Sequence, residues 1–222
     1  MLLPEPVTQA SMEPHSIFRE REFLSSHIER FLVRSVSVKD VLSVWSGLRP
    51  LVRNGIGNTS KLSRDHKLLV SPSGLISVIG VKWTTYRRMG EDAIDRSASI
   101  GKLPSAPPRT ADLHLHGWMP NRSPDKIEAT ELVYGSDLPA LQVLSEDDST
   151  MDDLLHPWLP YKRHEAVWAI RHEMARNVED LPPRRTRALS LDARAAIEAA
   201  PTVVPLIAQE VSTPGKAGGF LV

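Results

Sequence analysis

The sequence predicts an α+β protein in which a small sheet-and-helix region is followed by an all-helical region. Two short apolar runs flank a Pro- and Gly-containing turn at residues 67–80, and a helical repeat of apolar residues starts near Thr84. Several amphipathic segments follow residue 105. We therefore predict one domain at 1–104, a helical domain at 105–211 and a disordered tail at 212–222.

The first region is expected to begin with a helix. The segment "SIFREREFLSSHIERFL" (16–32) has apolar residues at helical spacing opposite a charged face. The next segment, 36–52, starts as a short helical turn and is predicted to end as a strand at 47–52. A polar loop leads to "KLLV" (67–70) and "GLISVIG" (74–80), which read as a β-hairpin closed by "SPSG".

From Thr84 onward the apolar period becomes helical, with one face formed by Tyr86, Met89, Ala93 and Ser97. The proline-rich stretch "GKLPSAPPRTADLHLHGW" (101–118) reads as a linker. Beyond it, we expect helices at 127–133, 137–145, 164–180, 191–199 and 202–211. The sequence "LPPRR" (181–185) should end the third of these, since proline lacks the N–H that continues a helix.

Composition limits the classes of function. The chain has 222 residues, and its 27 basic and 27 acidic residues give no net charge, which argues against a nucleic-acid binder. It has no cysteine, so disulfides, thiolate metal sites and cysteine nucleophiles are excluded. We expect a cytoplasmic protein, because no apolar run is long enough for a spanning helix and the N-terminus lacks the features of a signal peptide.

Several suggestive motifs have simpler explanations. "GIGNTSK" (55–61) lacks the spacing of a phosphate-binding loop and reads as a flexible loop. His164 and His172 lie two helical turns apart, roughly 12 Å along the axis, which is too far for one ion. The pair His114 and His116 does not complete a ligand set either, so we expect no metal site. The acidic run "DDSTMDD" reads as a solvated loop.

The stretch "GVKWTTYRR" (80–88) is the strongest candidate site. A strand that ends in Gly80 allows a close approach of another backbone or a planar ligand. The following turn presents the N–H groups of Trp83, Thr84 and Thr85 at a helix N-terminus, and Lys82 adds a positive charge. This combination favours an anionic or electron-rich group. The alternative is that Lys82 is simply solvated and a threonine only caps the helix.

Arginines form a second candidate group. Arg49 lies in the apolar stretch "SGLRPLV", where an unpaired charge is costly, and Arg64 lies in "KLSRDH". Together with Lys82 they suit a phosphate or carboxylate, which guanidinium groups bind with two hydrogen bonds. An internal salt bridge, such as Arg64 with Asp65, explains them equally well.

Four blocks of the sequence carry a family resemblance. They are "VLSVWSGLRPLV", "GNTSKLSRDHKLLVSPSG", "LISVIGVKWTTYRRMGEDAID" and the segment "LPYKRHEAVWAIRHEMARNVEDLPPRRTRALSLDARAAIEAAPTVV". In order and spacing they resemble the C-terminal portion of FAD-dependent glycerol-3-phosphate dehydrogenases, from about Glu13 to Glu210. The dinucleotide-binding fingerprint GxGxxG with which those enzymes begin is absent from this sequence.

The resemblance implies roles for the candidate residues. Gly80, Val81, Lys82, Trp83, Thr84 and Thr85 would line the flavin ring of FAD. Lys82 would act as the catalytic cation that stabilises the reduced ring. Val81 departs from the family, which usually has glycine there. Arg49 and Arg64 would bind the phosphate of the substrate.

The expected reaction is oxidation of glycerol 3-phosphate to dihydroxyacetone phosphate, with electrons passed to a quinone. The first domain would be part of the flavoprotein's substrate domain, and a separate flavin-domain chain is a conceivable partner. Peripheral association with the inner face of the cell membrane is implied through the intact enzyme. The alternatives are a non-catalytic helical interaction module and one half of a split flavoenzyme.

Overall fold

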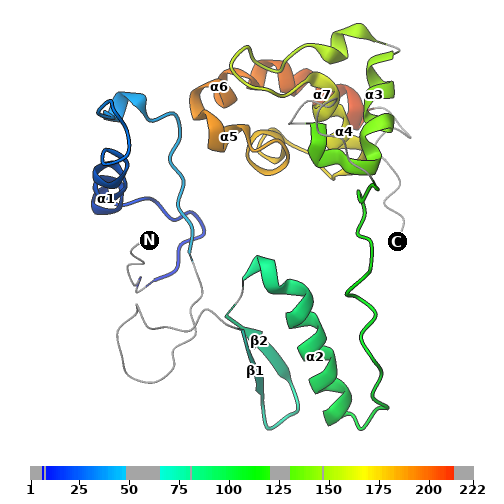
Figure 1. The fold of residues 1–222 in the computed structure, drawn as a ribbon. Coiled ribbons are helices and arrows are strands. Elements are labelled where there is room, and N and C mark those ends of the chain that lie inside the picture. The colour runs from blue at the N-terminus through cyan, green and yellow to red at the C-terminus, as the bar shows by residue number, and fades with distance from the viewer. Residues whose placement is uncertain are drawn as a thin grey trace. The chain divides into compact units, whose positions relative to one another are not determined.

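The structure is a computed structural model that describes residue 7 and residues 9–48, 66–80, 82–120, 131–146 and 148–212. The chain divides into two compact units. One comprises Met1–Leu24 and Ser46–His114, and the other comprises Ser25–Trp45 and Leu115–Val222. Helices dominate, and one two-stranded antiparallel sheet completes the described part, so the α+β prediction is confirmed (Figure 1).

The first unit contains the predicted hairpin. Strand β1 (Lys67–Val70) pairs antiparallel with β2 (Ile76–Ile79), with Lys67 opposite Ile79 and Val70 opposite Ile76. The turn between them is closed by the Gly74 N–H, which donates to the Ser71 carbonyl at 2.9 Å. Gly74 has a φ of 86°, a conformation that glycine adopts without strain. The "SPSG" signal therefore identified this turn correctly.

A short 3₁₀ turn, η3 (Trp83–Thr85), follows the hairpin and leads into helix α2 (Tyr86–Ile100). The helix lies beside the hairpin and packs against β2 (Figure 1). The predicted change from strand to helix near Thr84 is confirmed. Yet no side chain of β1, β2 or α2 is buried. Residues 103–110 of the predicted linker have no regular structure.

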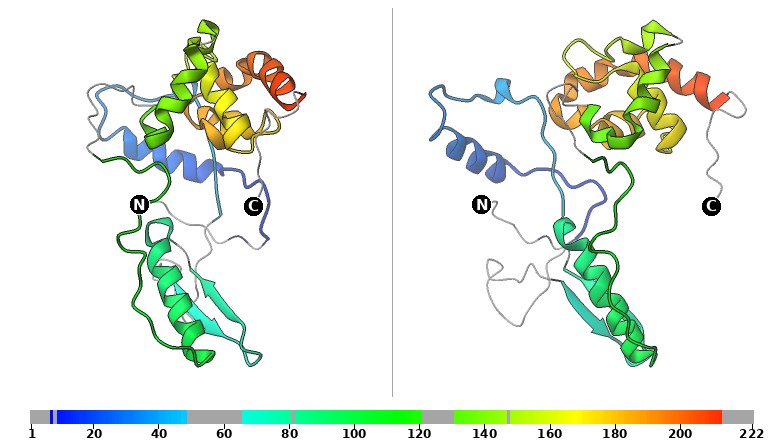
Figure 2. Two further views of the ribbon diagram at one scale, coloured as in Figure 1. Left: turned by 90° about the vertical axis from the view of Figure 1, so that its right-hand side faces the viewer. Right: turned by 45° about the vertical axis from the view of Figure 1, so that its right-hand side comes forward.

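The second unit is a bundle of short helices built around α4 (Arg163–His172) (Figure 2). Its elements are η5 (Glu131–Asp137), α3 (Leu138–Glu146), η6 (Ser149–Asp152), α4, the π-helical turn η7 (Asp180–Arg185), α5 (Ala188–Leu191), α6 (Ala193–Glu198) and α7 (Ala200–Ser212). Helix α4 packs against both α3 and α7. Its residues His164 to Ile170 are all buried, and this run forms the centre of the core.

The segment Ser25–Trp45 belongs to this second unit, whereas Phe18–Leu24 of the first helix belongs to the first unit. Helix α1 (Phe18–Ile28) is shorter than the predicted 16–32 and has no buried residue. The turn η1 (Val38–Asp40) is followed by an extended segment that contacts the bundle. The Leu42 carbonyl accepts from the Ala193 N–H at 3.1 Å, and the Ser43 hydroxyl donates to the Leu189 carbonyl at 2.6 Å. The boundary between residues 104 and 105 stays a prediction.

The structure corrects the prediction of one long helix at 164–180. Helix α4 ends at His172, and Met174 adopts a left-handed φ of 61°. The Ala175 N–H then donates back to the Ala169 carbonyl at 3.0 Å, as in the common helix-ending motif that usually has glycine at the left-handed position. Because methionine occupies this position, the sequence lacks the glycine that would have marked the end.

Three smaller corrections concern helix boundaries. Pro182 and Pro183 lie within η7 and end no long helix. The predicted helix at 191–199 is divided between α5 and α6, because the Asp192 carboxylate accepts from the Ala195 N–H at 3.0 Å and so caps a new helix. In the predicted segment 127–133, residues 131–133 are 3₁₀ rather than α-helical, and 127–130 lie outside the described residues.

The remaining predictions concern two helices, one strand and the C-terminal tail. Helices α3 and α7 confirm the predictions at 137–145 and 202–211. For the strand predicted at 47–52, residues 47 and 48 have no regular structure and the rest lie outside the described part, as do residues 213–222 of the predicted tail. No described helix combines the length and the apolar character needed to cross a membrane.

Candidate functional site

The candidate site is the turn between β2 and α2. Gly80 is buried and has a φ of 74°, so the backbone turns sharply where the strand ends. A side chain at this position would be strained whatever space surrounds it. Lys82 returns to an extended conformation (φ −114°, ψ 129°) and precedes the 3₁₀ turn of Trp83 to Thr85. The sequence prediction of a glycine-ended strand and a helix start is confirmed as local structure.

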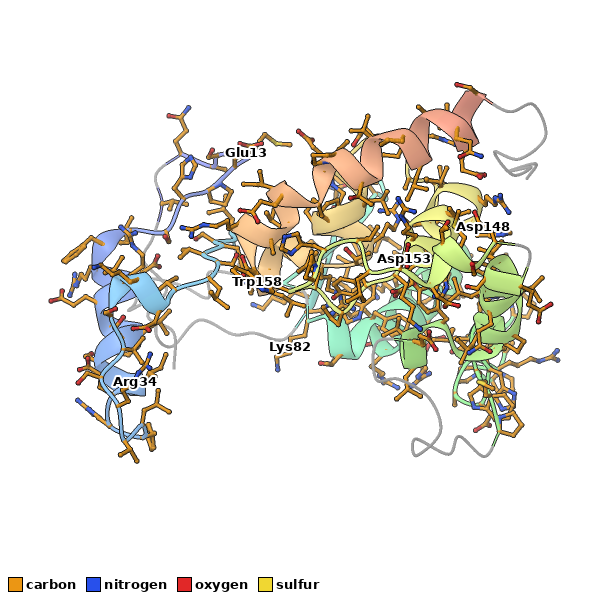
Figure 3. The ribbon with its side chains drawn as sticks, turned by 90° about the horizontal axis from the view of Figure 1, so that it is seen from above. Glu13, Arg34, Lys82, Asp148, Asp153 and Trp158 are labelled. Atoms are coloured by element: carbon orange, nitrogen blue, oxygen red, sulfur yellow. The ribbon has the colours of Figure 1, made fainter. Side chains whose placement is uncertain are left out.

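The side chains of this turn are accessible. Lys82, Trp83, Thr84 and Thr85 are all exposed, and Lys82 is labelled in Figure 3. Trp83 is 83% exposed and stacks on Tyr86, with ring centroids 5.7 Å apart and planes inclined by 29°. At this exposure, Trp83 buries little of its ring against the rest of the chain. It offers a flat apolar surface beside the lysine.

The side chain of Thr85 does not cap helix α2. Thr85 occupies the cap position of α2, but its hydroxyl donates to the Lys82 carbonyl at 3.0 Å. Its side chain accepts no hydrogen bond from the first turn of the helix. Helix N-termini carry partial positive charge on their N–H groups. The Thr85 N–H donates to the Lys82 carbonyl at 3.1 Å and the Tyr86 N–H donates to the Trp83 carbonyl, so η3 already uses the first donors of α2. Binding of an electron-rich group at this turn stays a prediction.

The charged residues that follow on α2 form a network. Glu91, which is only 11% exposed at its side chain, accepts from Arg87 and from Arg88, each at 2.6 Å. Arg88 also contacts Asp92 at 3.1 Å, and Asp92 binds His66 Nε2 at 2.7 Å. The positive charges of Arg87 and Arg88 are thus both paired with carboxylates. The His66–Asp92 contact ties the first residue of the hairpin region to α2.

Not every predicted site residue can be placed. Gly80, Lys82, Trp83, Thr84 and Thr85 share one turn, whereas Arg49, Arg64 and Val81 lie outside the described residues. The proposed clustering of Arg49 and Arg64 with Lys82 stays a prediction. The site roles of the whole set likewise remain predictions.

Sequence reasoning missed the network that stabilises the turn. The spacing of Arg87 and Glu91 (i, i+4) is typical of an ion pair on a helix face, so this contact could be predicted from the sequence. The contact of His66 with Asp92 joins residues 26 positions apart, and nothing local in the sequence indicated it.

The histidines considered for metal binding have other surroundings. His164 is buried at 1% exposure, while His172 is exposed and lies against Trp168 with ring centroids 4.0 Å apart. His116 binds Asp137 at 2.6 Å on the surface. Within the described residues, no group of three or more His, Asp or Glu side chains is arranged to hold a metal ion.

The helical region matches a known domain family. Residues 108–215 match the C-terminal domain of alpha-glycerophosphate oxidase. This range begins after α2 and includes the whole bundle from η5 to α7. The all-helical part of the chain therefore corresponds to a recognised domain.

Longer similarity extends through the hairpin and α2. The chain is 33% identical to the mitochondrial glycerol-3-phosphate dehydrogenase of Rattus norvegicus over 214 residues. It is 32% identical to a probable mitochondrial glycerol-3-phosphate dehydrogenase of Caenorhabditis elegans and to the enzyme SDP6 of Arabidopsis thaliana. These matches cover 86%, 92% and 89% of this chain, but only 29%, 31% and 36% of the relatives. The chain is therefore a homologue of the C-terminal part of glycerol-3-phosphate dehydrogenases, and it spans about a third of their length.

Proposed function

We propose that this chain acts as the C-terminal part of an FAD-dependent glycerol-3-phosphate dehydrogenase and functions together with a dinucleotide-binding half. The reaction would oxidise glycerol 3-phosphate to dihydroxyacetone phosphate and deliver the electrons to a quinone. The observation that carries the proposal is the similarity to glycerol-3-phosphate dehydrogenases over most of the chain, including the β2–α2 turn.

The local geometry of the described part of the turn supports a role at the flavin ring. The backbone at Gly80 has no side chain to obstruct a planar group, and the side chain of the cap residue Lys82 does not cap the N-terminus of η3. Lys82 is itself exposed. Bound FAD would supply the hydride acceptor. Lys82 and the helix N-terminus would stabilise the negative charge that arrives with the hydride.

We assign Arg49 and Arg64 to the substrate phosphate. Guanidinium groups bind phosphate oxygens with two parallel hydrogen bonds, and glycerol 3-phosphate carries about two negative charges near neutral pH. Binding energy from a phosphate that does not react can orient the carbon that does. These two arginines would therefore distinguish glycerol 3-phosphate from glycerol.

The exposed apolar surface of the first unit supports a requirement for a further half. Along β1, β2 and α2, six large apolar side chains are exposed: Leu69 at 51%, Val70 at 38%, Val78 at 36%, Tyr86 at 48%, Ile94 at 69% and Ile100 at 40%. A two-stranded hairpin is marginally stable in water by itself, and packing against α2 leaves these apolar side chains exposed. A dinucleotide-binding half would provide that cover and complete the sheet.

Reconstitution tests the proposal directly. The full chain would be purified alone and then mixed with the N-terminal two thirds of a related glycerol-3-phosphate dehydrogenase. We expect no tight FAD binding by the chain alone, since it has no GxGxxG turn for the pyrophosphate. The mixture should bind FAD and bleach its absorbance on addition of glycerol 3-phosphate. Sub-micromolar FAD binding by the chain alone, or an inactive though associated mixture, would contradict the proposal.

Two substitutions separate the assigned roles in that mixture. Arg49→Ala should lower the use of glycerol 3-phosphate about ten- to a hundredfold and hardly change the use of glycerol, because one charge-assisted contact is lost. Lys82→Ala should slow flavin reduction by both substrates and lower the reduction potential. Equal loss with both substrates for Arg49→Ala, or normal reduction in Lys82→Ala, would show that the roles are wrong.

A second candidate is a non-catalytic helical interaction module. It is favoured by the observation that all the buried apolar side chains among the described residues lie between Leu138 and Leu206. If the chain associates with no flavin-binding half but residues 131–212 retain a cooperative fold, this candidate replaces the first.

Location is a separate proposal. We propose that the chain lies in the cytoplasm, at the inner face of the cell membrane, although the relatives are named as mitochondrial proteins. Cell fractionation with an antibody to the chain distinguishes the two compartments.

A further inference from the structure

A cluster of buried polar side chains lies at the start of α4, in the second unit. His164 and Glu165 are each 1% exposed, and Glu131 from η5 is 5% exposed. Lys162 Nζ lies 3.1 Å from Glu131 Oε1. Burial of several ionisable groups is costly unless they satisfy one another. These buried polar groups therefore form one cluster, held in part by the Lys162–Glu131 ion pair, inside a core that is otherwise apolar.

His164 connects α4 to α3 and η5. Its Nδ1 lies 2.8 Å from the Ser145 hydroxyl, and its Nε2 lies 3.7 Å from Glu131 Oε1. Ser145 also donates to Asp152 at 3.3 Å. These contacts join four elements, α3, α4, η5 and η6, around one imidazole.

Glu165 makes two hydrogen bonds, one that caps α4 and one that holds η5 against α4. The Lys162 N–H donates to Oε2 at 2.7 Å, which caps the helix, and the Tyr134 hydroxyl donates to Oε1 at 3.2 Å. The ring of Tyr134 packs edge-on against Trp168, with centroids 6.4 Å apart. Burial and the neighbouring Glu165 raise the pKa of Tyr134, so this hydroxyl remains a donor. The position of η5 thus depends on the carboxyl group of Glu165.

The carboxyl group is finely balanced between its two protonation states. Burial is the largest influence and raises the pKa of Glu165 from 4.5 to about 7, with a smaller contribution from the negative charge of Glu131. The donors Lys162 N–H and Tyr134 O–H act in the opposite direction, as does the Lys162 ammonium. The folded arrangement consequently binds this proton more tightly than an exposed glutamate does.

We propose that Glu165 is a proton-operated latch that controls how firmly η5 (Glu131–Asp137) is held against α4. With the carboxyl protonated, the Lys162–Glu131 pair is balanced and η5 is held closed. Loss of the proton places two buried carboxylates, Glu131 and Glu165, beside one ammonium, which favours opening of η5. This inference concerns the helical bundle and does not depend on the proposed flavin site.

The elements packed around α4 carry other titratable and charged groups. They are Glu131, Tyr134 and Asp137 from η5, Asp152 from η6, Tyr161, Lys162 and His164 at the start of α4, His172 and Glu173 at its end, Arg185 from η7, and Glu210 from α7, which binds Arg171. Glu131 of η5 acts on Glu165 at the start of α4, whereas Asp137 of η5 acts on His172 and Glu173 at the other end of α4.

Hydrogen–deuterium exchange of the full chain tests the latch. Peptides covering residues 131–137 would be followed from pH 5.5 to pH 8.5, with correction for intrinsic exchange, under conditions where exchange reports the opening equilibrium. We expect the opening equilibrium to increase by up to about tenfold per pH unit below pH 7 and to level off near pH 8. Peptides from α6 should show no such step.

Two variants and one control make the result specific. Glu165→Gln, which cannot lose a proton, should remove the pH step, whereas the same change at exposed Glu179 should leave it intact. Tyr134→Phe deletes one donor to the ionised carboxylate, so the step should move to higher pH. If Glu165→Gln fails to fold, the Tyr134→Phe shift decides alone. A flat wild-type profile, a step retained in Glu165→Gln, or an unmoved step in Tyr134→Phe would overturn the proposal.

Discussion

The hairpin–helix region (66–114) and the helical bundle (131–212) bury their apolar side chains very differently. Every buried apolar side chain among the described residues lies in the bundle, between Leu138 and Leu206. In the hairpin–helix region, the described residues include no buried apolar side chain, and Trp83 and Ile94 are 83% and 69% exposed. The first region has well-defined secondary structure without a core. The second derives its stability from packing.

This difference shows that the two regions obey different energetic rules. Burial of a large apolar side chain contributes about 1.5–3 kcal/mol, and the bundle contains many such side chains. The hairpin–helix region relies on strand pairing, ion pairs and turn geometry, each of which contributes about 1 kcal/mol or less. Equivalent substitutions should therefore have unequal effects in the two regions. The first of four experiments compares the regions directly, and the other three test the interactions within each region.

Removal of one core isoleucine should have the largest effect. Ile170 on α4 is fully buried, so Ile170→Ala should lower the free energy of unfolding by about 2–5 kcal/mol. The matched change in the other region, Ile94→Ala on α2, should cost about 0.5 kcal/mol or less, because that side chain is exposed. Urea unfolding followed by circular dichroism provides both values. Similar losses in the two variants would refute the contrast between the regions.

The bundle should also show pH-dependent stability that depends on Glu165. Its folded-state pKa, about 7, lies above the ordinary 4.5, so the folded chain holds the proton between these values and the unfolded chain does not. Stability from this group is therefore greatest below pH 4.5, falls as pH rises toward 7 and is constant above. The wild type should lose up to about 3 kcal/mol relative to Glu165→Gln across this window. Parallel unfolding curves for the two proteins at all pH values would disprove it.

Loss of a half-buried ion pair should rank third. Arg171 binds Glu210 with two hydrogen bonds, Nε to Oε2 at 2.7 Å and Nη2 to Oε1 at 2.8 Å, and Glu210 is only 4% exposed. Arg171→Met leaves this carboxylate buried without its guanidinium, which should cost about 2 kcal/mol. Arg184→Met breaks the Arg184–Asp180 pair, in which Arg184 is 56% exposed, and should cost about 0.5 kcal/mol. Thermal unfolding compares them, and an equal cost would contradict this ranking.

The smallest effect is expected from the hairpin–helix region. His66→Ala removes the contact with Asp92, whose partners are 18% and 26% exposed, and should cost about 1 kcal/mol or less. Hydrogen exchange of β1 should nevertheless accelerate, because His66 ties the hairpin to α2. The control His116→Ala deletes a more exposed His–Asp contact and should leave β1 unchanged. Unaltered exchange of β1 in His66→Ala would show that strand pairing alone stabilises the hairpin.

Local chemistry allowed much of the secondary structure to be predicted from the sequence. The "SPSG" turn, the short apolar runs beside it and the helical repeat from Thr84 each depend on neighbouring residues, and β1, β2 and α2 confirm them. The family blocks likewise follow from the order of residues, and the comparisons confirm them. The end of α4 was missed because Met174 holds a conformation that usually indicates glycine.

The tertiary structure alone decided which side chains are buried and which of them meet. Tyr134 and Glu165 are 31 positions apart, as are Glu131 and Lys162, and His66 and Asp92 are 26 apart. The sequence determined the helices and the turn that carry these residues, because backbone preferences and capping act over a few positions. It could not determine that Glu165 would lie beside a second carboxylate, because such a contact and its shifted pKa arise only when distant elements pack together and exclude water.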